Sequence, residues 1–257
     1  DLLPERLDPR LLHRVLTNLT KRVLDLVTAL GALIVLSPAL ALISVLIKLD
    51  TPGPVLYRGP RVGKDGRPFR ILKFRTMYEC PESYDGPCVT GPDDKRITPL
   101  GHWLRDTKLN ELPQLLNVLV GEMSLVGPRP EDPEIVQGWP KDAWLEVLSV
   151  RPGITSPASI VYHHEERLLS GTDIMDNYLE DVLPDKMRLD RLYVRNRSLR
   201  SDLDVILWTV FILIARVAEV RIPEGYLFAG PITYVANRYV FWFLADAVIA
   251  LSAVGMV

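Results

Sequence analysis

The longest apolar run in the chain, from about Leu26 to Ile47, constrains its fold more than any other feature. About 20 apolar residues in one helix are enough to cross a bilayer, yet Ser37 and Pro38 interrupt the run near its middle. Proline removes one backbone hydrogen bond and clashes with the preceding turn, so it bends a helix. The run therefore predicts either a straight spanning helix that tolerates a proline, or a helix that enters the membrane, bends and leaves by the same face.

The charges beside the run bear on this choice. Lys21 and Arg22 precede it and Lys48 follows it, whereas a straight span usually has its positive flank on the cytoplasmic side only. Ser37 can donate a hydrogen bond to a carbonyl at the bend, which lowers the cost of the break in lipid. The residues alone leave both topologies open.

The rest of the chain is too polar for a bundle of membrane spans. Its 257 residues are 48% hydrophobic and 24% charged, which is typical of a globular domain with a membrane anchor. The formal net charge of −2 gives no general attraction to nucleic acid, so we expect no nucleic-acid partner. Cys80 and Cys88 lie in a polar loop with no histidine nearby, which predicts two reduced thiols rather than a zinc site.

A basic segment follows the apolar run. Two β-like stretches flank "GKDGR", whose Asp-Gly pair is a signal for a hairpin turn. Beside the single acid Asp65, the segment carries seven cationic residues: Arg58, Arg61, Lys64, Arg67, Arg70, Lys73 and Arg75. Two interpretations are open: a solvated or headgroup-facing hairpin, or a surface that binds the phosphates of a substrate or a lipid, with Lys73 and Arg75 among its contacts.

The segment "NELPQLLNVL" carries the first candidate catalytic residues. Proline is tolerated only in the first turn of a helix, so Pro113 predicts a helix that begins near Asn110. The buried stripe of this helix would consist of Leu112, Leu115, Leu116 and Leu119. Asn110 and Glu111 would lie at the positive end of the helix dipole, which stabilises a phosphate or an ionised carboxylate. An ordinary N-cap followed by a first-turn acid would have the same sequence.

Two arginines are placed to contact the same anion. Arg129 lies between Pro128 and Pro130, which restrict the backbone and so fix the direction of its guanidinium group. Arg105 precedes Glu111 on the same short segment. Arginine binds phosphate through two parallel hydrogen bonds. The acid, the arginines, the helix start and the basic hairpin together predict phosphoryl transfer, in which charge on the non-bridging oxygens must be neutralised.

Three motifs, "KFRTM", "LRDTKLNELPQLLNVLVGEMSLVGPRPE" and "RPGIT", together resemble the bacterial sugar transferases, also called monotopic phosphoglycosyl transferases or polyprenyl-phosphate hexose-1-phosphate transferases. The likeness runs from about Lys21 to Val220. It implies an enzyme of the bacterial inner membrane that transfers a sugar 1-phosphate from a UDP-sugar to polyprenyl phosphate, releases UMP, uses Mg²⁺ and starts glycan assembly. It also implies that Ser37 and Pro38 are the break of a re-entrant helix, which places the catalytic domain in the cytoplasm.

The chain departs from the family pattern at the catalytic pair. The family has Asp-Glu there, with the Asp forming a covalent phosphosugar intermediate close to the metal, whereas this chain has Asn110-Glu111. An amide is a poorer nucleophile and a weaker Mg²⁺ ligand than a carboxylate. Three explanations are open: Glu111 is the nucleophile; the lipid phosphate attacks directly while Glu111 binds the metal; or the chain is an inactive scaffold for UDP-sugar or lipid, naturally or through an engineered Asp-to-Asn change. A second departure, at "GITSPASIVYHHEERLL", leaves the sugar unassigned.

These features predict an α+β fold that is membrane-associated and mostly helical, with a small β-hairpin. We expect an amphipathic lead-in over 1–20, a re-entrant helix over 21–50, a cytosolic catalytic domain over 51–200, an interfacial helix over 201–222 and an extension over 223–257. The extension is similar in composition to the first membrane helix of membrane-bound nucleotide-sugar dehydratases, which predicts a fused or partner dehydratase. A homodimer is a further expectation.

Overall fold

The computed structural model describes residues 9–85, 89–91, 94–163, 165, 174–215, 225, 227 and 230–235. Its main elements in chain order are α1 (Pro9–Asp50), β1 (Leu56–Val62), β2 (Pro68–Phe74), α2 (Glu82–Asp85), α3 (Pro99–Asp106), the 3₁₀ turn η2 (Leu109–Glu111), α4 (Gln114–Val120), β3 (Ser124–Val126), α5 (Pro133–Gln137), α6 (Lys141–Val147), β4 (Gly153–Thr155), α7 (Pro157–Val161), α9 (Ile174–Asn177), the π-helical turn η3 (Tyr178–Val182), α10 (Leu183–Asn196), α11 (Leu199–Ala215) and α13 (Pro231–Val235). The predicted mostly helical fold with a small antiparallel hairpin is confirmed. A second pairing, parallel between β3 and β4, was not predicted.

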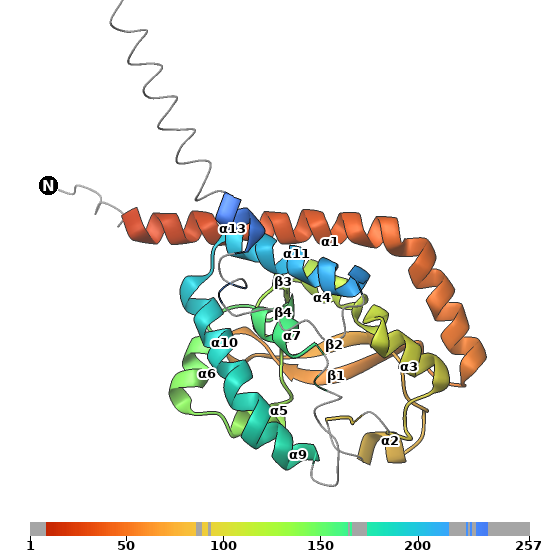
Figure 1. Cartoon of the computed structure of the whole chain (residues 1–257). Helices are drawn as coiled ribbons and strands as arrows, with labels where there is room; N and C mark the ends of the chain where they lie inside the picture. The colour runs from red at the N-terminus through yellow and green to blue at the C-terminus, as the bar shows by residue number, and fades with distance from the viewer. Residues whose placement is uncertain are drawn as a thin grey trace, which may run out of the picture.

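The β1–β2 hairpin lies at the centre of the molecule, with helices around it (Figure 1). The helix α1 crosses one side together with α11, while α6, α5 and α10 lie on another side and α3 on a third. Residues 225, 227 and 230–235 are the described part of the predicted extension, so the dehydratase-like segment lies outside the described residues. The interfacial helix predicted over 201–222 corresponds to α11, of which residues 216–220 also lie outside them.

The helix α1 is continuous across the predicted boundary between lead-in and membrane helix, and it bends sharply in its second half (Figure 1). Pro38 lies inside it, and we attribute the bend to this residue. Because Pro38 has no N–H, the carbonyl of Ile34 loses its helical donor. The Ser37 hydroxyl donates to that same carbonyl at 2.8 Å, as the Ser-Pro pair predicts. Within the described residues, α1 is the one helix long and apolar enough to cross a membrane.

Both arms of α1 pack on the same globular body. The first arm contacts β2 and α4 through Ala29, Ala32 and Leu36. The second arm buries Ile43 and Ile47 against Phe74 of β2 and Leu104 of α3. The bend therefore lets one helix follow two faces of the domain, which a straight helix of this length could not do.

The predicted hairpin turn is confirmed, and its geometry explains the Asp-Gly pair. The two strands pair from Leu56 opposite Phe74 to Val62 opposite Pro68. Asp65 and Gly66 have φ of 57° and 75°, a left-handed region that Asp tolerates better than most residues and Gly adopts freely. The Asp65 N–H donates to the Leu148 carbonyl at 2.7 Å, which attaches the turn to the segment after α6.

The predicted helix start at Asn110 is wrong. Lys108 adopts a left-handed φ of 56°, so Leu109–Glu111 form a separate 3₁₀ turn and α4 begins at Gln114 after Pro113. The rotation of α4 also differs from the predicted stripe. Leu115 is buried as predicted, but Leu116 is 40% exposed.

Asn117 explains this rotation, because its side chain replaces a missing strand at the free edge of β2. Its amide oxygen accepts from the Leu72 N–H at 2.9 Å, and its amide nitrogen donates to the Arg70 carbonyl at 2.9 Å. The same nitrogen donates to Glu122 at 2.7 Å. Asn117 is 1% exposed, so it joins helix to hairpin at a place where a leucine would leave two backbone groups without partners.

We predict that Asn117→Ala lowers the free energy of unfolding by about 3 kcal/mol, because it leaves the Leu72 N–H and the Arg70 carbonyl buried and unsatisfied. Urea unfolding of the detergent-solubilised chain, followed by tryptophan fluorescence, measures this. Asn196→Ala is the matched control, since this exposed amide donates only to the Leu192 carbonyl in its own helix, and we expect a change within about 0.5 kcal/mol. Equal effects of the two substitutions would contradict the role assigned to Asn117.

Candidate functional site

Glu111 lies at the centre of the candidate site, at the end of the tight turn η2. The left-handed Lys108 reverses the chain after α3, and the Glu111 N–H closes the turn on the Lys108 carbonyl at 3.1 Å. This turn directs the carboxylate of Glu111 toward the end of β2 and the Pro-Arg-Pro segment. Each of these two elements contributes one cation.

The carboxylate of Glu111 binds both cations directly. Its Oε1 accepts from Lys73 Nζ at 3.1 Å and from one Arg129 nitrogen at 2.7 Å, and its Oε2 accepts from the other Arg129 nitrogen at 3.2 Å. The guanidinium group of Arg129 thus forms the two-bonded fork predicted for phosphate, here with a carboxylate. The side chains of Lys73, Glu111 and Arg129 are 18%, 13% and 26% exposed. We call these three residues the Glu111 cluster.

The electrostatics of the cluster follow from burial and from opposite charges. Burial alone would raise the pKa of Glu111, but Arg129 and Lys73 outweigh it and hold this pKa well below its usual range. The charge of Glu111 raises the pKa of Arg129. Burial lowers the pKa of Lys73 to about 8, although Glu111 opposes that shift. At neutral pH the cluster therefore contains one carboxylate and two cations, which leaves it one net positive charge with which to attract an anion.

Asn110 is buried beside the cluster, at 7% exposure. Within the described residues its Oδ1 atom accepts no hydrogen bond. A buried amide oxygen without a partner usually costs free energy, and such atoms occur where a ligand or an ion supplies the missing contact. This observation marks Asn110 as a position that a substrate group or a cation could complete.

The other two predicted arginines do not contact Glu111. Arg105 donates to the hydroxyls of Thr76 at 3.1 Å and Thr90 at 2.7 Å. Arg75 is 6% exposed and donates to the carbonyls of Thr51, Pro52 and Ile47, which fixes the end of α1. These contacts support a structural role for Arg75. Phosphate binding by either arginine stays a prediction.

The set of oxygen ligands for Mg²⁺ is small. Within the described residues no group of three or more His, Cys, Asp and Glu could hold a metal ion. Two oxygens of the Asn110-Glu111 pair have room for a further contact. Glu111 Oε2 accepts a single hydrogen bond, and Asn110 Oδ1 accepts none within the described residues. Mg²⁺ commonly takes one or two protein oxygens and completes its shell with phosphates and water. Asn110 and Glu111 are therefore the residues that would hold a cation whose other ligands come from a bound diphosphate.

A second buried network fixes the Pro128-Arg129-Pro130 segment, and sequence reasoning missed it. Next to this segment, Glu131 accepts from Tyr178 at 2.7 Å and from Lys186 at 3.2 Å. Lys186 is 3% exposed and also donates to Glu165 at 2.9 Å. Glu131 belongs to the motif that contains Pro-Arg-Pro, but no feature of the sequence connects it with Lys186, which lies 55 residues further along the chain.

Asp190 of α10 is the part of this network that touches the backbone of Arg129. It is buried close to the Arg129 N–H and the Ser156 hydroxyl, which favour its ionised form, and within the described residues its Oδ1 atom accepts no hydrogen bond. Burial raises its pKa to about 7, against the nearby charge of Lys186. Asp190 thus lies next to the segment that carries Arg129.

Comparisons with known proteins identify the family of the chain. The family model described as "Bacterial sugar transferase" matches residues 16–216. A UDP-glucose:undecaprenyl-phosphate glucose-1-phosphate transferase of Caulobacter vibrioides is 40% identical over 205 residues, which are 77% of this chain and 71% of that protein. An undecaprenyl-phosphate glucose phosphotransferase of Komagataeibacter xylinus is 39% identical over 197 residues, 75% of this chain and 35% of that protein.

A third relative, a UDP-glucose:undecaprenyl-phosphate glucose-1-phosphate transferase of Escherichia coli, is 35% identical over 201 residues, 76% of this chain and 40% of that protein. These three relatives are named as transferases that act on undecaprenyl phosphate. The chain belongs to the bacterial sugar transferases, as its motifs predict. It spans well under half the length of the Komagataeibacter xylinus and Escherichia coli relatives.

The raised pKa of Asp190 predicts a pH-dependent stability. In the folded chain the carboxyl stays protonated up to about pH 7, whereas in the unfolded chain it ionises near its ordinary value of 3.8. Folding therefore takes up a proton between these values, and the contribution of Asp190 to stability falls as pH rises through that window. Asp190→Asn, which mimics the protonated form, should gain stability relative to wild type between pH 5 and pH 7.5.

Thermal unfolding of both proteins in detergent at these two pH values checks this prediction. Asp142→Asn, an exposed substitution in the same domain, serves as the control for general charge effects. A difference between Asp190→Asn and wild type that stays constant across the window would contradict the raised pKa.

Proposed function

We propose that the chain transfers a sugar 1-phosphate from a UDP-sugar to polyprenyl phosphate, releases UMP and thereby starts glycan assembly at the cytoplasmic face of the bacterial inner membrane. The single observation that carries this proposal is the Glu111 cluster, which lies inside the family match and keeps one net positive charge. Phosphoryl transfer requires such preorganised charge. The printed activities of the Caulobacter vibrioides and Escherichia coli relatives support the same reaction.

In this reaction an oxygen nucleophile attacks the sugar-bound phosphorus of the UDP-sugar. The bond from that phosphorus to the bridging oxygen breaks, and UMP leaves with the bridging oxygen and its electron pair. Arg129 can donate two hydrogen bonds to the non-bridging oxygens, where charge is spread in the transition state. Lys73 can neutralise charge on the departing phosphate. Asn110 and Glu111 would hold a Mg²⁺ ion, which would supply further positive charge next to the diphosphate.

The nucleophile is either Glu111 itself or the phosphate of the polyprenyl lipid. Both oxygens of Glu111 accept hydrogen bonds from Lys73 or Arg129, and its low pKa keeps it ionised. A covalent role would require one oxygen to leave Arg129. Those contacts favour direct attack by the lipid phosphate, with Glu111 holding the two cations in place.

The alternative function is a membrane scaffold that binds UDP-sugar or lipid without turnover. The amide at Asn110, where the family has a carboxylate, is the observation that favours it. The same residue can be tested directly, because Asn110→Asp restores the family pair.

We predict that the full chain in nanodiscs releases UMP when it is given UDP-sugars, polyprenyl phosphate and Mg²⁺. With direct attack, UMP appears only when the lipid phosphate is present. With Glu111 as nucleophile, UMP appears without the lipid, and mass spectrometry of the acid-quenched protein finds a phosphosugar on Glu111. Release of UMP by Asn110→Asp but not by the natural chain would establish the scaffold.

Two variants control this assay. Glu111→Gln should abolish turnover in either version, since it removes the charge that holds Lys73 and Arg129. Glu134→Gln, an exposed acid at the start of α5, should leave turnover unchanged. A fully active Glu111→Gln would remove Glu111 from the mechanism, and Asp94 and Asp106 would be examined next.

We also propose that α1 enters the membrane and returns to the same side. Its outward side chains are apolar on both sides of Pro38, for example Val27 and Val35 before it and Leu42 and Val45 after it, at exposures between 55% and 76%. Both arms are held by the same domain, the first through Lys21, which binds Asp202 at 2.6 Å, and the second through Ile43 and Ile47, which pack with Phe74 and Leu104. Two arms that bind one globular body support a single membrane face for both ends of the apolar run.

The topology predicts that cysteines placed at positions 20 and 50 are labelled from the same side. Thr20→Cys and Asp50→Cys, each in a chain with Cys80→Ser and Cys88→Ser, should react with an impermeant maleimide only after the cells are lysed. Lys141→Cys, on the surface of the globular domain, is the reference for that compartment. Labelling of exactly one of the two positions in intact cells would show that α1 crosses the membrane.

A further inference from the structure

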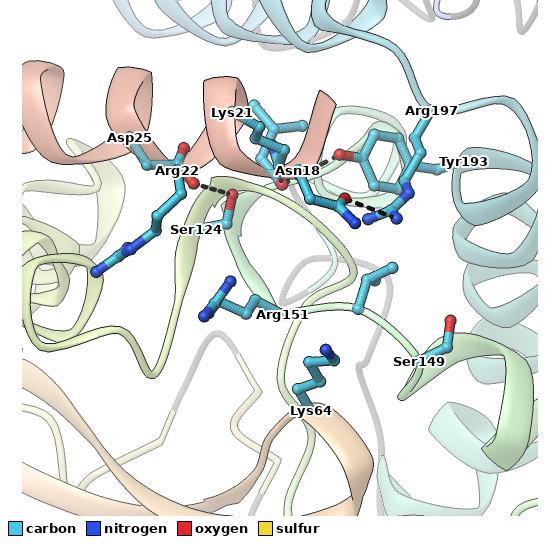
Figure 2. A pocket seen from close by; sticks show the side chains of 12 residues that line it. Asn18, Lys21, Arg22, Asp25, Lys64, Ser124, Ser149, Arg151, Tyr193 and Arg197 are labelled. Atoms are coloured by element: carbon cyan, nitrogen blue, oxygen red, sulfur yellow. Dashed lines mark hydrogen bonds between the residues drawn. The ribbon is translucent and has the colours of Figure 1, made fainter. Parts of the chain in front are cut away.

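A cavity of about 130 Å³ lies under the first arm of α1. Its wall is formed by α1, the β1–β2 turn, β3, the segment before β4 and the end of α10 (Figure 2). None of Lys73, Asn110, Glu111 and Arg129 lines it. The cavity is thus separate from the Glu111 cluster.

Cationic side chains dominate this wall. They are Lys21, Arg22, Lys64, Arg151 and Arg197, and they come from four different elements. Figure 2 shows Arg22 above and Lys64 below the segment that carries Arg151. Asp25 is the one acid that lines the cavity, and its oxygens accept from the Ser124 hydroxyl at 2.7 Å and from the Leu125 N–H at 3.1 Å.

Two of the five cations pair with a carboxylate, Lys21 closely and Lys64 only at long range. Lys21 pairs with Asp202 at 2.6 Å. In the part of the chain that the structure describes, the hydrogen bonds of the three arginines go to neutral oxygens. Arg22 donates to the Val118 and Leu119 carbonyls.

Arg151 and Arg197 have similarly neutral acceptors. Arg151 donates only through its Nε to the Gly121 carbonyl at 2.9 Å, so the two terminal nitrogens of its fork are available. Arg197 donates to the Asn18 amide oxygen at 3.1 Å. Lys64 has only a distant contact of 3.9 Å to Asp65, which is largely exposed. The cavity therefore has a surplus of positive charge and free donors directed at an anion.

The position of the cavity indicates where that anion comes from. The residues of α1 that line it, such as Lys21 and Asp25, alternate with outward apolar residues, such as Leu19, Val23 and Val27 at 59%, 50% and 64% exposure. The polar face of the helix thus closes the cavity, while its other face is suited to lipid. Cations directly beneath such a helix lie at the level of phospholipid headgroups.

We propose that this cavity is a second anion site that binds a phosphate group, supplied by the headgroup of an anionic phospholipid or by free phosphate. Arg151 and Arg197 supply donors at its rim, and Arg22 supplies charge in its wall. A phosphate bound there contacts α1, β3 and the end of α10 at once. The site goes beyond the proposed function, because its phosphate is not the one that reacts.

The test uses the detergent-solubilised full chain and three probes: dioctanoyl phosphatidylglycerol, dioctanoyl phosphatidylcholine and inorganic phosphate. We expect phosphatidylglycerol to bind, and its dissociation constant to rise about tenfold or more in Arg151→Gln/Arg197→Gln, because two charge-assisted donors are lost. Phosphatidylcholine should bind more weakly, since its choline group meets the cationic wall. If inorganic phosphate binds in place of phosphatidylglycerol, and the double variant weakens that binding, the ligand of the same site is free phosphate.

Lys141→Gln/Arg200→Gln is the matched control, because it removes two exposed cations that do not line the cavity. Binding that is equal in both double variants, or binding by neither anionic probe, would overturn the proposal. Thermal unfolding of each variant shows whether it is folded, and Arg151→Lys/Arg197→Lys, which keeps the charges, should retain most of the binding. UMP release by Arg151→Gln/Arg197→Gln should stay within twofold of wild type. The binding result therefore stands whether or not the chain proves to be active.

Discussion

The ion cluster of Glu111 with Lys73 and Arg129 connects three segments that are distant in the chain, and the arrangement of the site depends on it. Lys73 belongs to the central hairpin, Glu111 to the 3₁₀ turn before α4, and Arg129 to the Pro-Arg-Pro segment after β3. Removing one partner of such a buried set leaves an uncompensated charge, which is strongly destabilising. The cluster is therefore a structural junction that keeps one net positive charge.

The support around the cluster is rigid where the chemistry needs it. Lys186 donates a hydrogen bond to Glu131, next to the Pro-Arg-Pro segment. On the other side, Asn117 fastens α4 to the edge of the strand that carries Lys73. A guanidinium group whose neighbour and carboxylate partner are both held can neutralise transition-state charge with little reorganisation. Asn110, Gln114 and Asp190 each have a buried polar atom without a hydrogen-bond partner within the described residues.

The long helix α1 is joined to the domain by polar contacts as well as by apolar packing. Arg22 donates to the carbonyls at the end of α4, Asp25 accepts from β3, and Arg75 donates to the carbonyls at the end of α1 itself. A helix held along two arms cannot move away from the domain without breaking these bonds. The long apolar helix and the globular domain are thus one mechanical unit.

The sequence by itself determined the local features of this protein. The Ser-Pro pair specified a bend and the hydrogen bond that compensates it, the Asp-Gly pair specified a left-handed turn, and the motifs specified the family. These features depend on a few adjacent residues, for which backbone chemistry is decisive.

Only the tertiary structure decided which charges meet. Arg75 was expected near a phosphate, but its guanidinium group donates to the carbonyls of Ile47, Thr51 and Pro52 at and after the end of α1. Asn117, which lies outside the predicted leucine stripe, is buried against the edge of β2. The partnership of Glu131 with Lys186 and the gathering of Arg22, Arg151 and Arg197 around one cavity join elements far apart in the chain. Such pairings depend on how the elements pack, because a charged side chain binds whichever partner the fold brings near it.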